Sequence, residues 1–156
     1  MAQPATIEQL YVPVSGTPKT IICDLDGTLA LMNGRDPFDA SSCENDLLNV
    51  PVHTILKTFQ NQNNQYNTIV FVSGRSDKYR AETERWLEKV AKFTHFMLFM
   101  RKEGDFRKDS IVKLEIFNKH IRNDYDVSFV LDDRNQVVEM WRSLGLTCMQ
   151  VADGNF

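Results

Sequence analysis

The chain has 156 residues, of which 42% are hydrophobic and 25% charged, and this composition is that of a single soluble globular domain. Its formal net charge of −3 argues against broad electrostatic binding of nucleic acid, and no apolar stretch approaches the roughly 20 residues that a membrane span needs. The N-terminus lacks the order of a signal peptide and the three cysteines form no disulfide or zinc pattern, so we expect a cytoplasmic protein.

Strand-like and helix-like segments alternate after a polar N-terminal tail, which we expect to cover residues 1–19. Apolar spacing predicts strands at 20–24, 68–73, 95–100, 127–131 and 147–151, and helices at 51–60, 77–93, 109–121 and 135–144. This order predicts an α/β fold in which a mainly parallel sheet is covered by helices on both faces. We expect one domain over residues 20–156, with ligands bound beyond the carboxyl ends of the strands.

Two carboxylates stand at the end of the first predicted strand: Asp24 is its last residue, and Asp26 follows after Leu25 and precedes Gly27. With a strand period of two, both side chains leave on the same side, and Gly27 allows a sharp turn. At 4 Å and an effective dielectric near 20, two such charges repel by up to about 4 kcal/mol, so the pair needs a cation or a shared proton. The pair indicates a metal site for phosphoryl transfer, and the alternative is a turn that merely favours Asp.

Further polar groups end the second and fourth strands, namely Ser73, Gly74 and Arg75, and Asp132 and Asp133. Asp109 and Lys113 open a predicted helix nearby, and we expect all of these groups at the same edge of the sheet. Taken alone, the Asp132-Asp133 pair could cap a helix and Lys113 could be solvated helix surface. The long connection over residues 30–49, which carries Arg35, is typical of a lid or binding loop.

These motifs together resemble those of the haloacid dehalogenase-like (HAD) phosphotransferases: Asp-x-Asp-Gly-Thr after a strand, a later Ser-Gly, a helix-borne lysine and a terminal Asp-Asp. More narrowly, the segments 33–35, 72–75, 104–109 and 131–142 resemble the 3′-phosphatase domain of bacteriophage polynucleotide kinase-phosphatase. The likeness spans roughly residues 19–156 and implies a HAD-like Rossmannoid three-layer fold. The sequence lacks the Gly-x-x-x-x-Gly-Lys-Ser/Thr loop of a kinase, so we expect no kinase activity.

The resemblance implies a role for each carboxylate. Asp24 would be the nucleophile that forms an aspartyl-phosphate, and Asp26 would be the general acid and base, a role that requires a raised pKa. Mg²⁺ would be held by Asp24, by the backbone carbonyl of Asp26, and by one or both of Asp132 and Asp133.

The resemblance also implies groups that bind the phosphate. Ser73 and the amide of Gly74 would donate hydrogen bonds to it, and Lys113, held by Asp109, would stabilise the transition state. Arg35 and Arg75 are candidates for bidentate contacts to the phosphate, with surface salt bridges as the alternative.

The function that follows is a Mg²⁺-dependent polynucleotide 3′-phosphatase that acts on the 3′-phosphate ends of DNA or RNA in nucleic acid end repair. A HAD phosphatase for free nucleotides or other small phosphate monoesters is a second hypothesis, because one fold serves many substrates. A non-catalytic domain that holds a structural cation is a third. The sequence leaves open a homo-oligomer, a separate kinase or ligase partner, and the choice between DNA and RNA.

Overall fold

The structure is a computed structural model that describes residues 10–64 and 66–156. A five-stranded, all-parallel sheet with the strand order β5-β4-β1-β6-β7 forms its centre, which confirms the predicted α/β class. The strands are β1 (Lys19–Cys23), β4 (Thr68–Ser76), β5 (Phe96–Arg101), β6 (Asp126–Asp132) and β7 (Cys148–Gln150).

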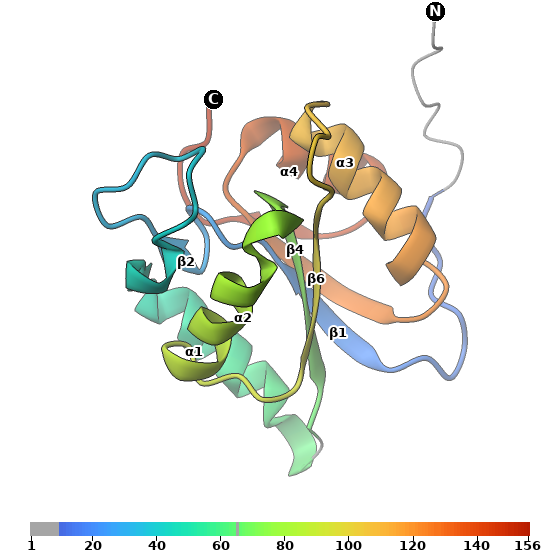
Figure 1. The fold of residues 1–156 in the computed structure, drawn as a ribbon. Coiled ribbons are helices and arrows are strands. Elements are labelled where there is room, and N and C mark those ends of the chain that lie inside the picture. The colour runs from blue at the N-terminus through green and yellow to red at the C-terminus, as the bar shows by residue number, and fades with distance from the viewer. Residues whose placement is uncertain (1–9, 65) are drawn as a thin grey trace, which may run out of the picture.

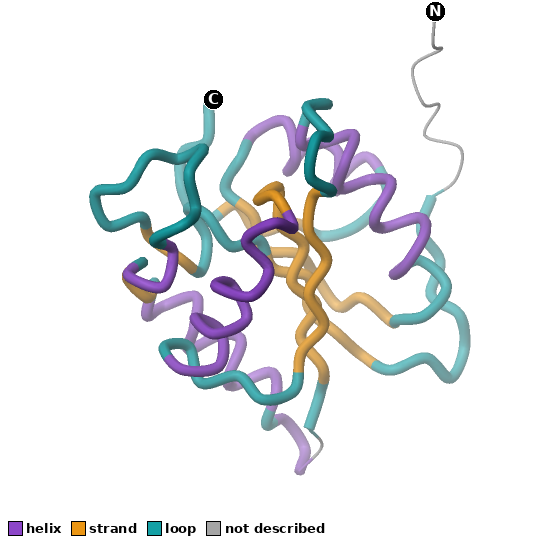
Figure 2. The backbone as a smooth tube through the Cα atoms, viewed as in Figure 1, coloured by secondary structure: helices purple, strands orange, loops and turns teal. Residues whose placement is uncertain are grey.

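Helices cover both faces of the sheet (Figures 1 and 2). They are α1 (Val50–Gln60), α2 (Arg80–Lys89), α3 (Asp109–Ile116) and α4 (Asn135–Ser143). Side chains along β1 alternate between two cores: Ile21 and Cys23 join the core under α1 and α2, whereas Ile22 joins the core under α4. Because both faces are covered, the strands are continuous apolar runs rather than alternating ones.

Some elements are shorter than the sequence predicts. The helix expected over 77–93 begins as a 3₁₀ turn (Asp77–Tyr79), and α2 ends at Lys89, shortly before Lys92 adopts a φ of 59° that no α-helix accommodates. The helix expected over 109–121 changes at Phe117 from α3 into a π-helical turn (Phe117–Ile121).

The expected lid over residues 30–49 contains regular structure that the sequence analysis missed. Its two short strands, β2 (Ala30–Leu31) and β3 (Leu47–Leu48), pair in an antiparallel manner, and a 3₁₀ turn (Cys43–Asn45) lies between them. Strands of two residues are too short to show a period, so no pattern in the sequence predicts them. A further 3₁₀ turn (Gln62–Asn64) follows α1.

The expected N-terminal tail lies partly outside the described residues, because residues 1–9 are not among them. Further along, Tyr11 contacts the domain: its backbone NH donates to the carbonyl of Leu144 at 2.8 Å, and its hydroxyl donates to the carbonyl of Tyr125 at 2.7 Å. Its ring meets the ring of Phe117 edge-on. Within the described part of the chain, no helix combines the length and apolar character needed to cross a membrane.

Candidate active site

A buried ammonium group lies at the centre of the residues that follow the strand ends. Lys113 on α3 is 1% exposed, and its Nζ donates to Oδ1 of Asp24 at 2.8 Å and to Oδ2 of Asp132 at 2.9 Å. Asp109, one helical turn earlier, lies 3.6 Å from the same ammonium. Burial alone would lower the pKa of Lys113, but the carboxylates of Asp132, Asp24 and Asp109 outweigh burial and raise it well above its usual range. Lys113 is therefore a fixed cation and not solvated helix surface.

The carboxylates around Lys113 carry more negative charge than one ammonium can neutralise. One oxygen from each of Asp24, Asp132 and Asp133 lies within 4.8 Å of the other two, and all three residues are buried. Burial raises the pKa of Asp24 well above its usual range despite the opposing effect of Lys113, and burial and Asp132 raise the pKa of Asp133. An all-oxygen donor set with an excess of negative charge fits a hard divalent cation.

The two adjacent aspartates after β6 differ in the oxygens that they leave for such a cation. Asp132 uses Oδ1 to accept the backbone NH groups of Asp133 and Arg134, and uses Oδ2 to accept from Lys113 and, at 3.4 Å, from Trp141. The carboxylate of Asp133, by contrast, accepts a long hydrogen bond of 3.3 Å from the hydroxyl of Thr28. Asp133 therefore offers the freer oxygens, and Asp132 holds the protein groups around it in place.

Gly27 allows the chain to turn beside this cluster. Its φ is +81°, and a Cβ atom at this position would lie 2.2 Å from Oδ2 of Asp133. Both the backbone conformation and the lack of space therefore require glycine, as expected for a sharp turn after β1. The turn also buries Thr28, whose hydroxyl lies 3.2 Å from Oδ2 of Asp24.

Asp26 points away from this cluster into a separate network of two arginines. Its Oδ1 accepts from Nη2 of Arg35 at 2.7 Å and from Nη2 of Arg75 at 2.6 Å. The same two guanidinium groups also contact the carboxylate of Asp46, at 2.8 and 3.3 Å. The side chains of Arg35, Arg75 and Asp46 are 5%, 3% and 1% exposed and that of Asp26 is 28% exposed, so these ion pairs are buried or partly buried and are not surface salt bridges.

This network corrects one expectation about Asp26. The sequence analysis expects a raised pKa, and burial does act in that direction, but the neighbouring charges of Arg75 and Arg35 outweigh it, and the pKa of Asp26 is lowered. Asp24 and Asp26 each have a separate cationic partner, which is Lys113 for Asp24 and Arg75 for Asp26. The two arginines therefore favour the ionised form of Asp26.

A bulge at the end of β4 positions the remaining candidate residues. The pairing register with β5 shifts between Ser73 and Ser76, and such a bulge re-aims the side chains within it, here that of Arg75. A Cβ atom on Gly74 would lie 2.2 Å from Oδ1 of Asp109, so the strand passes Asp109 closely only because this residue is glycine. The hydroxyl oxygen of Ser73 accepts the NH of Arg75 at 3.1 Å, which leaves its proton for another acceptor.

Three residues of this site were missed by the sequence analysis. Asp46 bridges the two arginines, Thr28 bridges Asp24 and Asp133, and Arg101 donates to the Gly74 carbonyl at 2.8 Å and to the carboxylate of Asp109 at 3.2 Å. Thr28 belongs to the quoted Asp-x-Asp-Gly-Thr motif, which could have identified it. Asp46 and Arg101 have no such signal, because their partners are distant in the sequence.

Comparisons with known proteins identify the family of this chain. Residues 18–156 match the family model described as the polynucleotide kinase PNKP phosphatase domain. A putative bifunctional polynucleotide kinase/RNA ligase of Autographa californica nuclear polyhedrosis virus is 40% identical over 138 residues, which are 87% of this chain and 20% of that protein.

Two solved structures of a Pnkp1/Rnl/Hen1 complex, one of them described as an RNA repair complex, contain similar chains. Each is 46% identical and matches with a TM-score of 0.85 over 99% of this chain, which corresponds to 48% and 53% of the two matched chains. The present chain therefore spans about a fifth of the viral relative and about half of each solved chain.

Proposed function

This chain belongs to the polynucleotide kinase PNKP phosphatase domain family of HAD-type phosphoric monoester hydrolases, and we propose that it is a Mg²⁺-dependent polynucleotide 3′-phosphatase. The observation that carries the proposal is that Asp24 and Asp133, at the ends of parallel strands, lie close together and that Lys113 of α3 contacts Asp24, in a chain that matches this family. The chain has no kinase-type phosphate-binding loop, and the proposal includes no kinase activity.

The proposed reaction begins at Asp24. A carboxylate oxygen of Asp24 attacks the phosphorus atom of the terminal phosphate, and the bond between phosphorus and the 3′-oxygen of the sugar breaks. Lys113, 2.8 Å from Asp24, is placed to stabilise the negative charge of the transferring phosphoryl group without moving. The hydroxyl of Ser73 and the amide of Gly74 would donate to the phosphate oxygens from the end of β4.

Asp26 is the proposed acid and base. It would donate a proton to the departing 3′-oxygen and then accept one from the water that attacks the aspartyl-phosphate, which releases inorganic phosphate and restores Asp24. An incoming phosphate would accept hydrogen bonds from Arg35 and Arg75, which also contact Asp26. The two arginines would then stabilise the ionised form of Asp26 less strongly. The two arginines would therefore link phosphate binding to the protonation state of Asp26.

The candidate ligands of the cation are Asp24, Asp133, Asp132 and the backbone carbonyl of Asp26. Mg²⁺ bound there would reduce the repulsion between the carboxylate of Asp24 and the entering phosphate dianion. The family and the buried acidic cluster support a divalent cation, and the choice of Mg²⁺ rests on the oxygen-only donor set.

The similar proteins also suggest where such an enzyme acts. The viral relative is named for polynucleotide kinase and RNA ligase activities, and the solved relatives belong to a complex named for RNA repair. We propose accordingly that this domain prepares polynucleotide ends together with a kinase or ligase component, which is either a partner chain or part of a longer chain.

The test is a substrate panel with purified protein in Mg²⁺. It compares 3′-phosphorylated DNA and RNA oligonucleotides, their 5′-phosphorylated counterparts and 3′-mononucleotides, with inorganic phosphate release as the readout. The proposal predicts release from the 3′-phosphorylated oligonucleotides at the highest kcat/KM. Equal rates on all of them would favour the second hypothesis, a phosphatase for small monoesters, and no release from any ester would favour a non-catalytic domain.

A further inference from the structure

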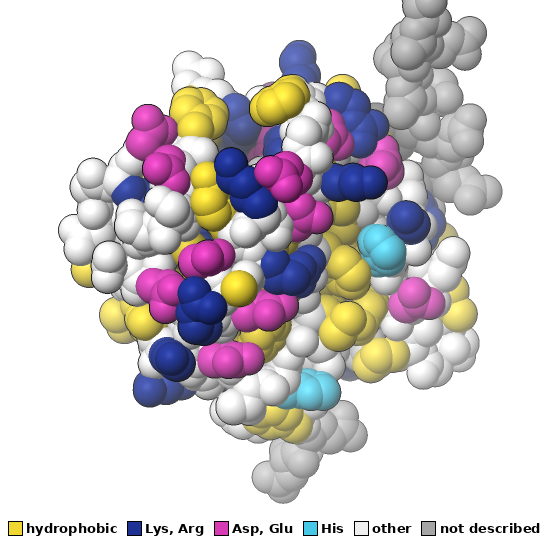
Figure 3. Space-filling model, in the orientation of Figure 1, with side chains coloured by type: hydrophobic (Ala, Val, Ile, Leu, Met, Phe, Trp, Pro, Cys, Tyr) yellow, Lys and Arg dark blue, Asp and Glu magenta, His cyan; other side chains and the backbone are white. Residues whose placement is uncertain are grey.

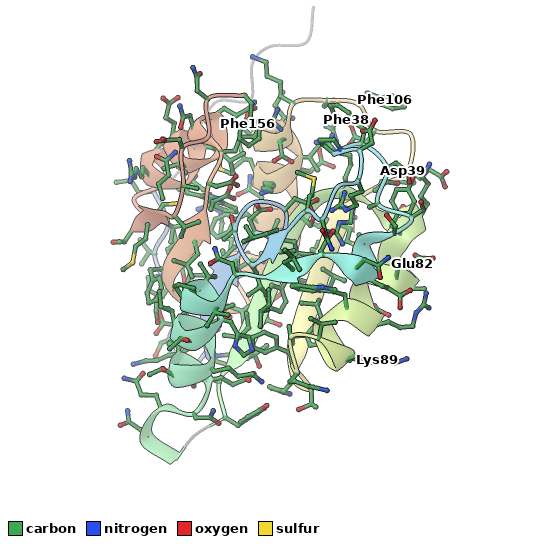
Figure 4. All side chains as sticks on the ribbon, turned by 90° about the vertical axis from the view of Figure 1, so that its left-hand side faces the viewer. Phe38, Asp39, Glu82, Lys89, Phe106 and Phe156 are labelled. Carbon is green, nitrogen blue, oxygen red and sulfur yellow. The ribbon has the colours of Figure 1, made fainter. Side chains whose placement is uncertain are left out.

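Two phenylalanine side chains are almost fully exposed on loops next to the site. Phe38 and Phe106 are each 95% exposed, the highest values among the large hydrophobic residues in the described ranges 10–64 and 66–156. Figure 4 shows both at one end of the molecule, and Figure 1 shows the segments that carry them on different sides of the tip of β4. Scattered exposed apolar side chains are normal on a protein surface, and what distinguishes these two is their position on loops beside the candidate site.

The loop that carries Phe38 is tied to Asp26 by an arginine. Arg35 donates through Nη1 to the carbonyls of Asp36 and Asp39 and through Nη2 to Asp26, so a single guanidinium joins the loop to the proposed acid. The NH of Phe38 also donates to Oδ1 of Asp36 at 2.7 Å. The phenyl ring therefore extends from a hydrogen-bonded turn.

The loop that carries Phe106 is held in the same manner from the other side. Arg101 donates to the carbonyls of Asp105 and Arg107 at 3.1 and 2.6 Å, and its remaining nitrogens contact Gly74 and Asp109. In each case one arginine thus contacts both the loop that carries the exposed ring and a residue of the candidate site. Phe156 lies at the same end (Figure 4), but its ring already has a cationic partner, the guanidinium of Arg134 at 5.1 Å from the ring centroid.

Local charge indicates what could cover these rings. Lys102 and Lys108 are exposed on the same loop as Phe106, and neither ammonium has an ion pair within the described part of the chain. Basic and acidic side chains are otherwise interspersed on the face that Figure 3 shows, so a polyanion would find local contacts there and no broad basic surface. Exposed aromatic rings beside unpaired lysines are the combination with which proteins bind single-stranded nucleic acid.

We propose that Phe38 and Phe106 stack on unpaired bases near the 3′ end of a single-stranded polynucleotide, and that Lys102 and Lys108 contact its backbone. This inference rests on the proposed function and adds the basis on which oligonucleotides are preferred to small phosphate esters. Stacking requires bases that are not already paired, so a single-stranded end is the favoured ligand and a blunt duplex is not.

The test measures binding separately from catalysis. The probe is a fluorescently labelled single-stranded oligonucleotide with a 3′-hydroxyl, which cannot be turned over, and the readout is anisotropy. The double variant Phe38→Ala/Phe106→Ala should bind about 10- to 100-fold more weakly than the parent, because each stacked base contributes to affinity. The variant Phe38→Trp/Phe106→Trp should bind like the parent, and Phe38→Leu/Phe106→Leu like the alanine variant. The control is Tyr66→Ala, which removes a half-exposed aromatic residue near the start of β4, at the opposite end of the sheet.

A second readout shows whether the variants keep an intact site. The alanine variant should hydrolyse p-nitrophenyl phosphate with the kcat/KM of the parent. Equal binding by the parent and the alanine variant, equal binding by the leucine variant, or no binding by the parent would overturn the proposed stacking. Parent protein that binds the probe but releases no phosphate from a 3′-phosphorylated oligonucleotide would overturn the proposed function instead, and the stacking would still be measured.

Discussion

Nη2 of Arg75 lies 2.6 Å from Oδ1 of Asp26, so a side chain from the end of β4 holds the carboxylate proposed as acid and base after β1. The contact is partly buried, because the side chain of Arg75 is 3% exposed and that of Asp26 is 28% exposed. Arg75 lies where the pairing register of β4 shifts. Asp26 thus depends for its position on residues about 50 positions away in the chain.

The first prediction concerns that contact. Arg75→Ala should lower kcat on a 3′-phosphorylated oligonucleotide by about 10²–10⁴-fold, the usual range for losing general acid–base catalysis. Arg75→Lys should recover little of it, because an ammonium lacks the planar fork that reaches two carboxylates. Arg80→Ala is the matched control, since Arg80 belongs to a partly exposed pair with Glu84. Full activity of Arg75→Lys would show that catalysis does not need the planar guanidinium group of Arg75.

The second prediction concerns Asp46. Asp46→Ala leaves Arg35 and Arg75 buried with one carboxylate between them, and breaking a buried charge network of this kind destabilises a protein by about 3 kcal/mol. Urea unfolding should show this loss as a lower midpoint. Glu84→Gln, in an exposed pair, should change the free energy of unfolding by less than about 1 kcal/mol. Equal stability of Asp46→Ala and the parent would contradict the view that Asp46 stabilises the buried guanidinium groups of Arg35 and Arg75.

The sequence predicted the parts of this site that belong to one local pattern. The ends of the strands follow from the ends of the apolar runs, so the positions of Asp24, Ser73 and Asp132 at one edge of the sheet could be predicted. The network of arginines around Asp26 could not be predicted, because Asp46 lies in a loop without periodicity and meets Arg35 and Arg75 only after folding. For the same reason the sequence offered the two arginines only substrate contacts or surface salt bridges, not buried pairs with Asp26 and Asp46, and the pKa of Asp26 was expected in the wrong direction.

The third prediction concerns the buried ammonium. Lys113→Met removes the cation between Asp24 and Asp132 and should reduce the free energy of unfolding in chelator by about 3–5 kcal/mol. Lys119→Met, at an exposed position of the following π-helical turn, is the control and should have little effect. The comparison is made by urea unfolding under identical conditions. A small loss for Lys113→Met would mean that the carboxylates do not depend on this cation.

The fourth prediction separates the two aspartates after β6. Mg²⁺ should raise the Tm of the parent by an amount that grows with its concentration, as for any ligand that binds only the folded state. Asp133→Asn should lose this increase while keeping the Tm of the parent in chelator. Asp132→Asn should already unfold at a lower temperature in chelator, because Asp132 accepts hydrogen bonds from Lys113, Asp133 and Arg134. The reverse pattern would make Asp132 the direct ligand.

The most direct measurement is phosphate release from a 3′-phosphorylated oligonucleotide in Mg²⁺ by the parent and by Asp24→Asn. Loss of a covalent nucleophile costs several orders of magnitude, so the variant should be at least about 10³-fold slower, with circular dichroism showing that it is folded. Turnover by Asp24→Asn at a rate near that of the parent would contradict an aspartyl-phosphate mechanism at this site.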